Sequence, residues 1–211
     1  MLEAARRQKV RRFVYASSSS VYGDAPGLPK REGQEGNPLS PYALTKQDNE
    51  RWAAQYTRHF GLPTIGLRYF NVFGSRQNPQ GPYAAVLPRF VQALQHNEAP
   101  VIYGDGRQSR DFTHVDNVVL ANLLALQAGE AAWGKAVNVA CGEAVTLLEA
   151  LEQVGKILGR HIPPRHLPPR PGDVRHSLAD LEAARILLGY QPVRLFAEGL
   201  EKTIAWYAQL T

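Results

Sequence analysis

Apolar residues form short buried runs that alternate with stretches of helical spacing, a pattern typical of α/β proteins. The segment RFVYASSSS (12–20) predicts a buried strand that ends in small polar residues, and LPTIGLRYFNVFG (62–74) predicts another. Between them, Ser40 before Pro41 predicts the start of a helix that runs from about Pro41 to Phe60 and ends at Gly61. A strand, a helix and a strand in this order imply parallel strands joined by a right-handed crossover.

The rest of the chain continues this alternation. Helices are expected over 2–9, 85–97, 111–129, 147–159 and 197–210, short strands over 99–106 and 136–142, and a proline-rich extended stretch over 162–176. Strands of the parallel type occur at three places, whereas a complete doubly wound sheet has about six. We therefore expect part of a doubly wound parallel sheet, residues 1–75 and 110–141, and a small α/β lobe, residues 76–109 and 142–211.

Charge and composition remove several function classes. The net charge is +5. The first twelve positions contain five basic residues and one acidic residue, Glu3, so this segment alone carries 5 − 1 = +4. A solvated terminal segment explains this better than a nucleic-acid-binding face, which would extend over the domain. No apolar run approaches a membrane span, and the one cysteine indicates a reducing, cytoplasmic setting. His161 and His166 do not have the spacing of metal ligands.

Candidate chemistry begins with Tyr42 and Lys46. Residues four apart lie on one face of a helix, so the phenol and the ammonium can converge. A nearby cation favours the ionised form of a phenol, which can then act as a general base. The serines Ser17–Ser20 end a buried strand, where sites form in α/β proteins. A solvated helix face and an ordinary polar strand end are the plain alternatives, but the combination is rarer than either part.

Five segments in order resemble the extended short-chain dehydrogenases, within the NAD-dependent epimerase/dehydratase family. They are FVYASSSSVYGD, SPYALTK, LRYFNVFG, GDGRQSRDFTHVDN and GDVRHSLAD, and the resemblance covers nearly the whole chain. It is closest to UDP-hexose 4-epimerases, especially those acting on UDP-N-acetylglucosamine. The resemblance implies a Rossmann-type fold, NAD as cofactor, a UDP-sugar substrate and 4-epimerisation through a transient 4-keto sugar.

The resemblance also assigns roles to residues. It implies that Ser18, Tyr42 and Lys46 are catalytic and that Tyr42, Lys46 and Tyr69 contact NAD. It implies that the substrate is held by Ser19, Ser20, Asn71, Ala85, Val86, Val101, Ile102, Tyr103, Arg110, Arg170, Asp173 and Ser177. A planar guanidinium suits a diphosphate, which supports Arg110 and Arg170. The alternative for Arg110 is a salt bridge with Asp105 or Asp111.

Two positions narrow the reaction. Members that act as 4,6-dehydratases resemble one another in an Asp-Glu pair after the catalytic residue, where this chain has Ser19 and Ser20. UDP-glucuronate decarboxylases tend to carry a Glu there, and UDP-glucuronate epimerases usually lack the pattern over 70–88. The position that limits N-acetyl sugars in the family falls on the small Ser177, so the resemblance favours an N-acetylated hexose.

The segment that begins complete members, with its glycine-rich turn for NAD, has no counterpart in this sequence. Met1 falls inside the helix before the strand that carries Ser18, so roughly 100 residues are missing, about one small domain. The alternatives are a truncated, inactive fragment or interaction module, and another nucleotide-sugar enzyme such as a UDP-glucuronate epimerase or decarboxylase or a dTDP-glucose dehydratase. We expect the chain alone to bind NAD poorly. The resemblance also makes a homodimer through the helix Pro41–Phe60 plausible.

Overall fold

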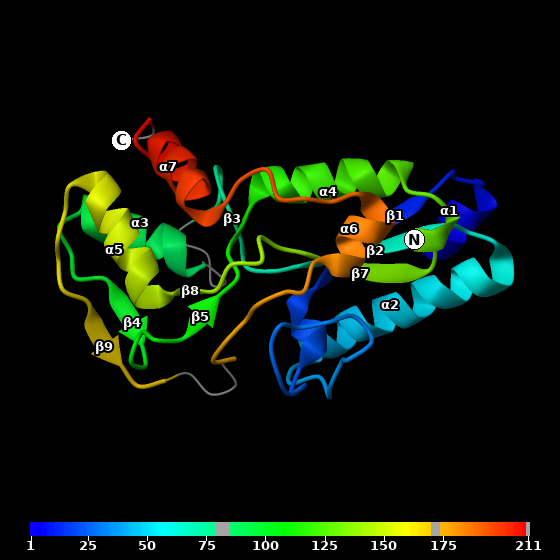
Figure 1. Ribbon diagram of the computed structural model, residues 1–211, viewed down its shortest axis with the longest axis horizontal. Helices are drawn as coiled ribbons and strands as arrows, with labels where there is room; N and C mark the ends of the chain where they lie inside the picture. The colour runs from blue at the N-terminus through cyan, green and yellow to red at the C-terminus, as the bar shows by residue number, and fades with distance from the viewer. Residues whose placement is uncertain (79–84, 170–173, 210–211) are drawn as a thin grey trace.

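The computed structural model describes residues 1–78, 85–169 and 174–209 and shows two packed bodies side by side (Figure 1). One body is built on a three-stranded sheet and contains the N-terminus. The other is a smaller lobe of helices and short strands that contains the last helix. Each body has its own hydrophobic core, and a smaller buried cluster among the described residues includes Val21, Tyr22 and Phe70.

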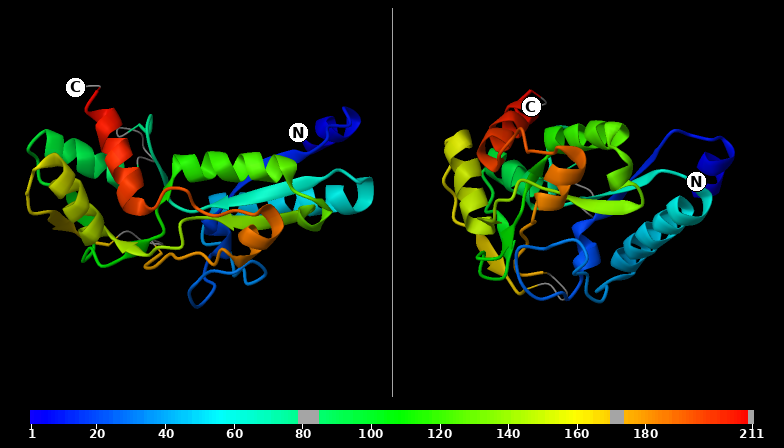
Figure 2. Two further views of the ribbon diagram at one scale, coloured as in Figure 1. Left: turned by 45° about the horizontal axis from the view of Figure 1, so that its top comes forward. Right: turned by 45° about the vertical axis from the view of Figure 1, so that its right-hand side comes forward.

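The three-stranded sheet is parallel throughout and has the order β1 (Phe13–Ser18), β2 (Thr64–Tyr69) and β7 (Lys135–Val139). Helix α2 (Pro41–Phe60) covers one face, and α4 (Val115–Gln127) covers the other (Figures 1 and 2). The expected parallel strands and crossover helix are confirmed. In parallel sheets ligands bind beyond the carboxyl ends of the strands, which here are Ser18 and Tyr69.

The ends of α2 follow from three residues. The Ser40 hydroxyl accepts a hydrogen bond from the Ala43 amide at 3.1 Å, and Pro41 occupies the first turn, where no backbone N–H is needed. At the other end Gly61 adopts a φ of 66°, a left-handed conformation that favours glycine. The helix therefore runs over the expected residues, and its start lies close to the end of β1.

The lobe gathers helices around short two-stranded sheets. Its core packs side chains such as Phe90, Ile102 and Leu200, all nearly or fully inaccessible. The helices are α3 (Val86–Gln95), α5 (Leu147–Leu158) and α7 (Phe196–Tyr207). The strands are β4 (Val101–Tyr103) parallel to β9 (Arg165–Leu167), and β5 (Ser109–Arg110) antiparallel to β8 (Val145–Thr146).

Several elements differ from the sequence expectation. Helix α4 begins at Val115, not 111, because Thr113–His114 (β6) pairs with Val72–Phe73 (β3) and His114 caps the helix. The proline-rich stretch contains β9, and the segment after it contains a short helix, α6 (Glu182–Leu188), that was not assigned from the sequence. Helix α6 packs on the sheet body through Ala184 and Leu188, although 142–211 was expected in the lobe. The remaining short elements are α1 (Leu2–Arg7) and the 3₁₀ turns η1 (Ser19–Tyr22) and η2 (Glu130–Ala132).

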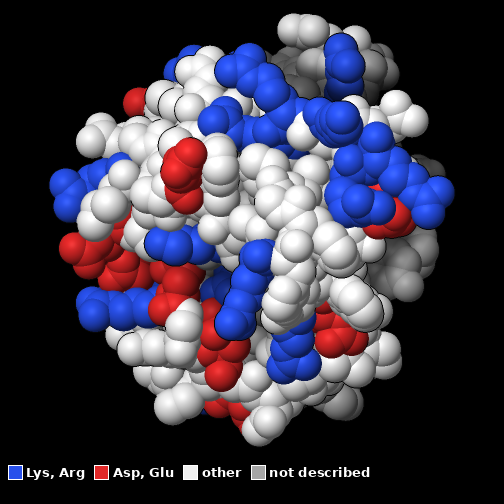
Figure 3. All heavy atoms as spheres, turned by 90° about the vertical axis from the view of Figure 1, so that its right-hand side faces the viewer, with Lys and Arg blue, Asp and Glu red and all other residues white. Residues whose placement is uncertain are grey.

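The end of the molecule that carries the N-terminus is shown by charge in Figure 3, where Lys and Arg gather on part of the face and mix with acidic residues elsewhere. In α1, Arg6 and Arg7 both pair with Glu3 at 2.8 Å. Among the described residues, no helix has the length and apolar character needed to cross a membrane. That part of the chain also has no group of three or more His, Cys, Asp or Glu placed to hold a metal.

The start of α5 gives a test of local stability. The Thr146 hydroxyl accepts from the Glu149 amide at 3.2 Å, and the Glu149 carboxylate accepts from the Thr146 amide at 2.8 Å. Thr146→Ala removes one side of this capping box and should lower the free energy of unfolding by about 1 kcal/mol in urea denaturation. Thr146→Ser keeps the hydroxyl and should lose far less; equal losses would show that the methyl group, not the cap, matters.

Candidate active site

Two adjoining hollows lie where the sheet body meets the lobe, and both are lined by Asn71 and Arg110. One has a volume of about 300 Å³ and is otherwise lined mainly by the lobe, with Ala85, Val86, Val101 and Tyr103 on its wall. The other has about 260 Å³ and is lined by η1, the start of α2 and the segment 174–177. We call them the lobe hollow and the sheet hollow. Small-molecule sites are typically concave and of this order of size.

Most of the expected substrate residues therefore come together. Ser19, Ser20, Asn71, Arg110 and Ser177 line the sheet hollow, and the lobe hollow has Asn71, Ala85, Val86, Val101, Tyr103 and Arg110. Ile102 differs: it is fully buried in the lobe core, because successive side chains of strand β4 point to opposite faces. The Ile102 side chain thus lines neither hollow, and the expected role of the segment 101–103 in holding the uridine stays a prediction. Arg170 and Asp173 lie outside the described residues.

Arg110 stands at the junction of the hollows. Its guanidinium donates to the backbone carbonyls of Ser109 at 2.9 Å and Arg175 at 3.3 Å, which fixes its direction. The two carboxylates named as alternative partners are engaged elsewhere. Asp105 pairs with Arg175 at 3.4 Å, and Asp111 accepts three backbone N–H groups deep in the protein. Burial raises the pKa of Asp111 to about 6 against the lowering effect of those donors.

Lys46 and Tyr42 lie on one face of α2, with the ammonium 5.6 Å from the centre of the phenol ring. The Lys46 ammonium donates to the Ala16 carbonyl of β1 at 2.9 Å, and the Tyr42 ring is 55% exposed. Ser18 ends β1, and its hydroxyl accepts from the Ser20 amide at 3.2 Å. These three residues do not line the hollows themselves. They border the sheet hollow, because their neighbours Ser19, Ser40 and Ala43 do line it.

One hydroxyl in the sheet hollow has no partner. The Ser20 oxygen is buried and makes no hydrogen bond among the described residues, although it belongs to a residue that lines the hollow. Buried polar atoms are rarely left unpaired in native proteins.

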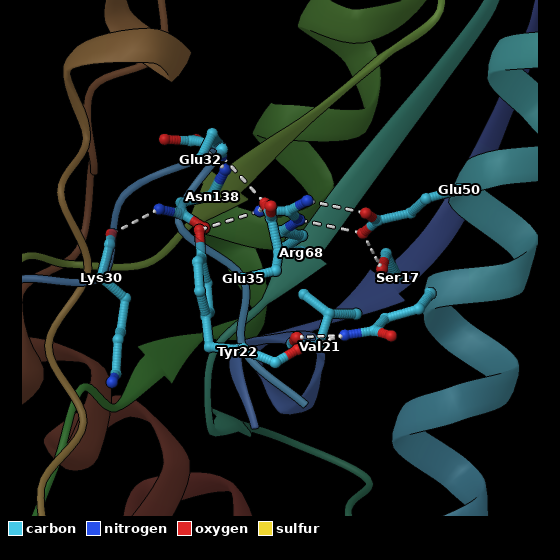
Figure 4. Close-up of polar contacts among 12 residues, drawn as sticks. Ser17, Val21, Tyr22, Lys30, Glu32, Glu35, Glu50, Arg68 and Asn138 are labelled. Atoms are coloured by element: carbon cyan, nitrogen blue, oxygen red, sulfur yellow. Dashed lines mark hydrogen bonds and ion pairs between the residues drawn. The ribbon is translucent and has the colours of Figure 1, made fainter. Parts of the chain in front are cut away.

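Beneath the end of β1, one guanidinium joins the segments that carry these residues (Figure 4). Arg68 of β2 donates to both carboxylate oxygens of Glu50 on α2, at 2.9 and 2.7 Å. It also pairs with Glu35 of the long loop at 2.5 Å and donates to the Tyr22 hydroxyl of η1 at 3.0 Å. Ser17 of β1 donates to Glu50 at 2.5 Å. We call these five residues the Arg68 network.

The electrostatics of this region follow from its burial. Burial alone would raise the pKa of Glu35, but the charge of Arg68 and the Gly33 amide hold it below its ordinary value. Burial raises the pKa of Glu32, whose carboxylate accepts from the Asn138 amide at 2.7 Å, and raises that of Tyr22 to about 12. The Tyr22 phenol therefore stays neutral and donates to the Asn138 side chain at 2.7 Å.

Tyr69, expected at the nicotinamide half of NAD, ends β2 beside Ser18 in the register. Its hydroxyl accepts from the Asn122 amide group of α4 at 2.9 Å, and burial raises its pKa. The residue is thus held on the α4 side of the sheet. Its contact with NAD stays a prediction.

Sequence reasoning missed several residues that line the hollows. Lys30 and His176 face the sheet hollow, and Arg89 and Gln108 face the lobe hollow. His176 follows Arg175 inside the motif GDVRHSLAD, so the motif could have indicated it. Lys30 lies in the long loop and has no local signal of its place, because contacts with residues 178–180 position it.

Comparison with known proteins agrees with this geometry. Residues 1–140 match the family described as the NAD dependent epimerase/dehydratase family. The chain belongs to this family. Its members include UDP-sugar 4-epimerases, and the expected family and fold class are confirmed.

Among its relatives, this epimerase/dehydratase chain is 38% identical over 208 residues to a UDP-glucose 4-epimerase of Mycolicibacterium smegmatis, covering 98% of the chain and 66% of the relative. A UDP-N-acetylglucosamine 4-epimerase from Methanobrevibacter ruminantium, solved with UDP-N-acetylmuramic acid, shows 37% identity and a TM-score of 0.94. The match covers 99% of this chain and 66% of that protein. A UDP-glucuronic acid 4-epimerase from Bacillus cereus, solved with UDP-glucuronic acid and NAD, shows 32% identity and a TM-score of 0.90. The match covers 100% of this chain and 65% of that protein. The chain thus spans about two thirds of the length of these proteins.

The Arg68 network predicts a large stability effect. Arg68→Met would leave the largely buried Glu50 without a counter-charge and would also remove the ion pair of the more exposed Glu35, so it should lower the free energy of unfolding by about 3–5 kcal/mol at pH 7. The deficit should shrink as pH falls from 7 towards 5, since burial without Arg68 raises the pKa of Glu35 and a proton then neutralises it. Denaturant unfolding at several pH values measures both effects.

The matched control is Arg31→Met, which breaks an ion pair with Asp180 whose arginine side chain is 58% exposed. This loss should stay within about 1 kcal/mol. Similar losses in the two variants would contradict a special role for the buried guanidinium.

Proposed function

We propose that this chain forms the catalytic and UDP-sugar-binding part of an NAD-dependent UDP-hexose 4-epimerase. The observation that carries the proposal is the pair of hollows joined at Arg110 and bordered by Ser18, Tyr42 and Lys46. A nucleotide-sugar also consists of three parts in a row, a nucleoside, a diphosphate and a sugar, which match one hollow, Arg110 and the other hollow. Its uridine suits the lobe hollow, which is lined by residues such as Val86, Val101 and Tyr103, its diphosphate suits Arg110, and its sugar suits the serine-lined sheet hollow.

The chain's own groups supply the acid–base steps. The Tyr42 oxygen, as phenolate, takes the proton of the sugar C4 hydroxyl and later returns one, which makes it a general base and then a general acid. The Lys46 ammonium stabilises the negative phenolate from the same helix face. The Ser18 hydroxyl donates to the C4 oxygen and holds it near Tyr42. Water is kept from the sugar by apolar side chains of the hollow such as Tyr22 and Phe70.

The described residues fit the nicotinamide end of NAD. The Tyr42 phenol is open, and the Lys46 ammonium reaches the outer edge of β1, so both can be approached from the side on which β1 has no neighbouring strand in this chain. Tyr42, Lys46 and Tyr69 would hold that end. When bound, NAD supplies the hydride exchange at the sugar carbon. The family's glycine-rich turn would hold its diphosphate, and this sequence does not contain one.

A homodimer through α2 stays a prediction. The helix exposes the large apolar side chains of Leu44, Trp52 and Phe60, which gives it an apolar outer face suited to association.

Tyr42→Phe tests the proposed reaction. The variant keeps the ring and loses the group that exchanges the proton, so interconversion of UDP-N-acetylglucosamine and its C4 epimer, with NAD added, should fall by roughly 10²–10⁴-fold. Binding of UDP, measured by calorimetry, should not change, because Tyr42 lines neither hollow. Wild-type chain that binds both UDP and NAD but gives no epimer would contradict the catalytic part of the proposal, and absence of UDP binding would contradict all of it.

Ser177→Tyr tests the choice of sugar. Ser177 lines the sheet hollow and is only 9% exposed, so a tyrosine there would take space that an N-acetyl group needs. Binding of UDP-N-acetylglucosamine should weaken at least tenfold relative to UDP-glucose. Ser177→Ala is the control and should keep the wild-type ratio of the affinities for UDP-N-acetylglucosamine and UDP-glucose. Equal weakening of the two sugars by tyrosine would refute the assignment.

A further inference from the structure

The sheet hollow carries positive charge at its sugar end. Lys30, Arg110 and His176 line it, and no Asp or Glu does so among the described residues. Arg110 is shared with the lobe hollow and is therefore assigned to the diphosphate. This leaves Lys30 as the permanent cation beside the serines.

The backbone of Lys30 is fixed next to Ser177. Its amide donates to the Leu178 carbonyl at 2.7 Å, and its own carbonyl accepts from the Asp180 amide at 2.9 Å. The Asn138 side chain donates to the same carbonyl at 2.9 Å. A half-buried side chain that starts from so constrained a backbone has a restricted set of positions, which reduces the entropy lost when it binds a ligand.

The Lys30 side chain points away from the nearby carboxylates of Glu32 and Glu35 (Figure 4). Its ammonium donates to the Ala25 carbonyl in the same loop. The described residues provide no carboxylate partner for it. One neutral acceptor leaves most of the ammonium's hydrogen-bonding capacity for a ligand, since this group has three donors.

The charge decides which sugar suits this position. A neutral sugar would cover the half-buried ammonium and remove water from it without offering a counter-charge, which is unfavourable. A carboxylate on the sugar would pay that cost with an ion pair and charge-assisted hydrogen bonds. A serine-lined wall still accommodates the remaining hydroxyl groups.

We infer that the sugar end of this site takes an acidic sugar, with Lys30 as the counter-charge of its carboxylate. The inference rests on the proposed function, since it requires a nucleotide-sugar across both hollows. It is compatible with a small residue at 177, because an N-acetyl group and a carboxylate are attached to different carbons of a hexose. Lys30 then determines specificity without entering the acid–base steps.

The test compares UDP, UDP-glucose and UDP-glucuronate by calorimetry, with no NAD and no turnover required. The two sugars differ at C6, a hydroxymethyl group against a carboxylate. Wild type should bind UDP-glucuronate about tenfold more tightly than UDP-glucose, which corresponds to about 1.4 kcal/mol. Lys30→Gln should abolish this difference and leave the affinity for UDP unchanged, and Lys30→Arg should retain it.

Lys9→Gln is the matched control, because it removes the same charge from an exposed position near the N-terminus and should keep the preference. Equal affinities of the wild type for the two sugars, or a preference that survives in Lys30→Gln, would overturn the role of Lys30 while the proposed function stands. A chain that binds none of the three nucleotides would refute the proposed function itself. Thermal unfolding of each variant confirms that it is folded.

Discussion

The site depends on one buried cation, Arg68. Its guanidinium contacts α2 through Glu50, the long loop through Glu35 and η1 through Tyr22, while Ser17 of β1 shares the Glu50 carboxylate. The proposed catalytic groups lie on these segments, one residue after Ser17 and one or two turns before Glu50. Breaking a buried ion pair costs more free energy of folding than breaking an exposed one. A buried charge of this kind therefore tolerates little displacement of its partners. The network thus holds strand end, loop and helix in one arrangement.

Each of the two bodies contributes residues to the candidate site. The sheet body carries Ser18, Tyr42 and Lys46, as expected at the carboxyl ends of parallel strands. The lobe supplies the wall of the second hollow, and its β5 carries Arg110, whose direction is fixed by carbonyls of Ser109 and Arg175. A ligand long enough to fill both hollows must pass this arginine, so the proposed nucleotide-sugar would place its diphosphate there.

The ends of α2 and the parallel strands could be predicted from the sequence, whereas several positions that depend on distant contacts could not. Ser40, Pro41 and Gly61 fix the ends of α2 by their own backbone chemistry, so the helix could be predicted to the residue. The start of α4 could not, because β6 pairs with β3, 41 residues earlier in the chain, in place of the expected first helical turn. The burial of the Ile102 side chain could not be predicted either, because a motif marks a segment, whereas strand alternation decides which side chains face the hollow. Lys30 was missed because residues far along the chain determine its position.

The same region keeps opposite charges apart. Glu32, Glu35 and Glu50 surround Arg68 below the strand ends, whereas Lys30 and Arg110 face the hollow. Asn138 lies between the two groups: its amide group donates to the Lys30 carbonyl and its oxygen accepts from Tyr22, the phenol that also contacts Arg68. The acidic side chains are therefore engaged by partners of their own and are not available to neutralise Lys30. A cation left beside a ligand hollow by such an arrangement favours anions, so the packing that holds the catalytic segments also biases what the hollow binds.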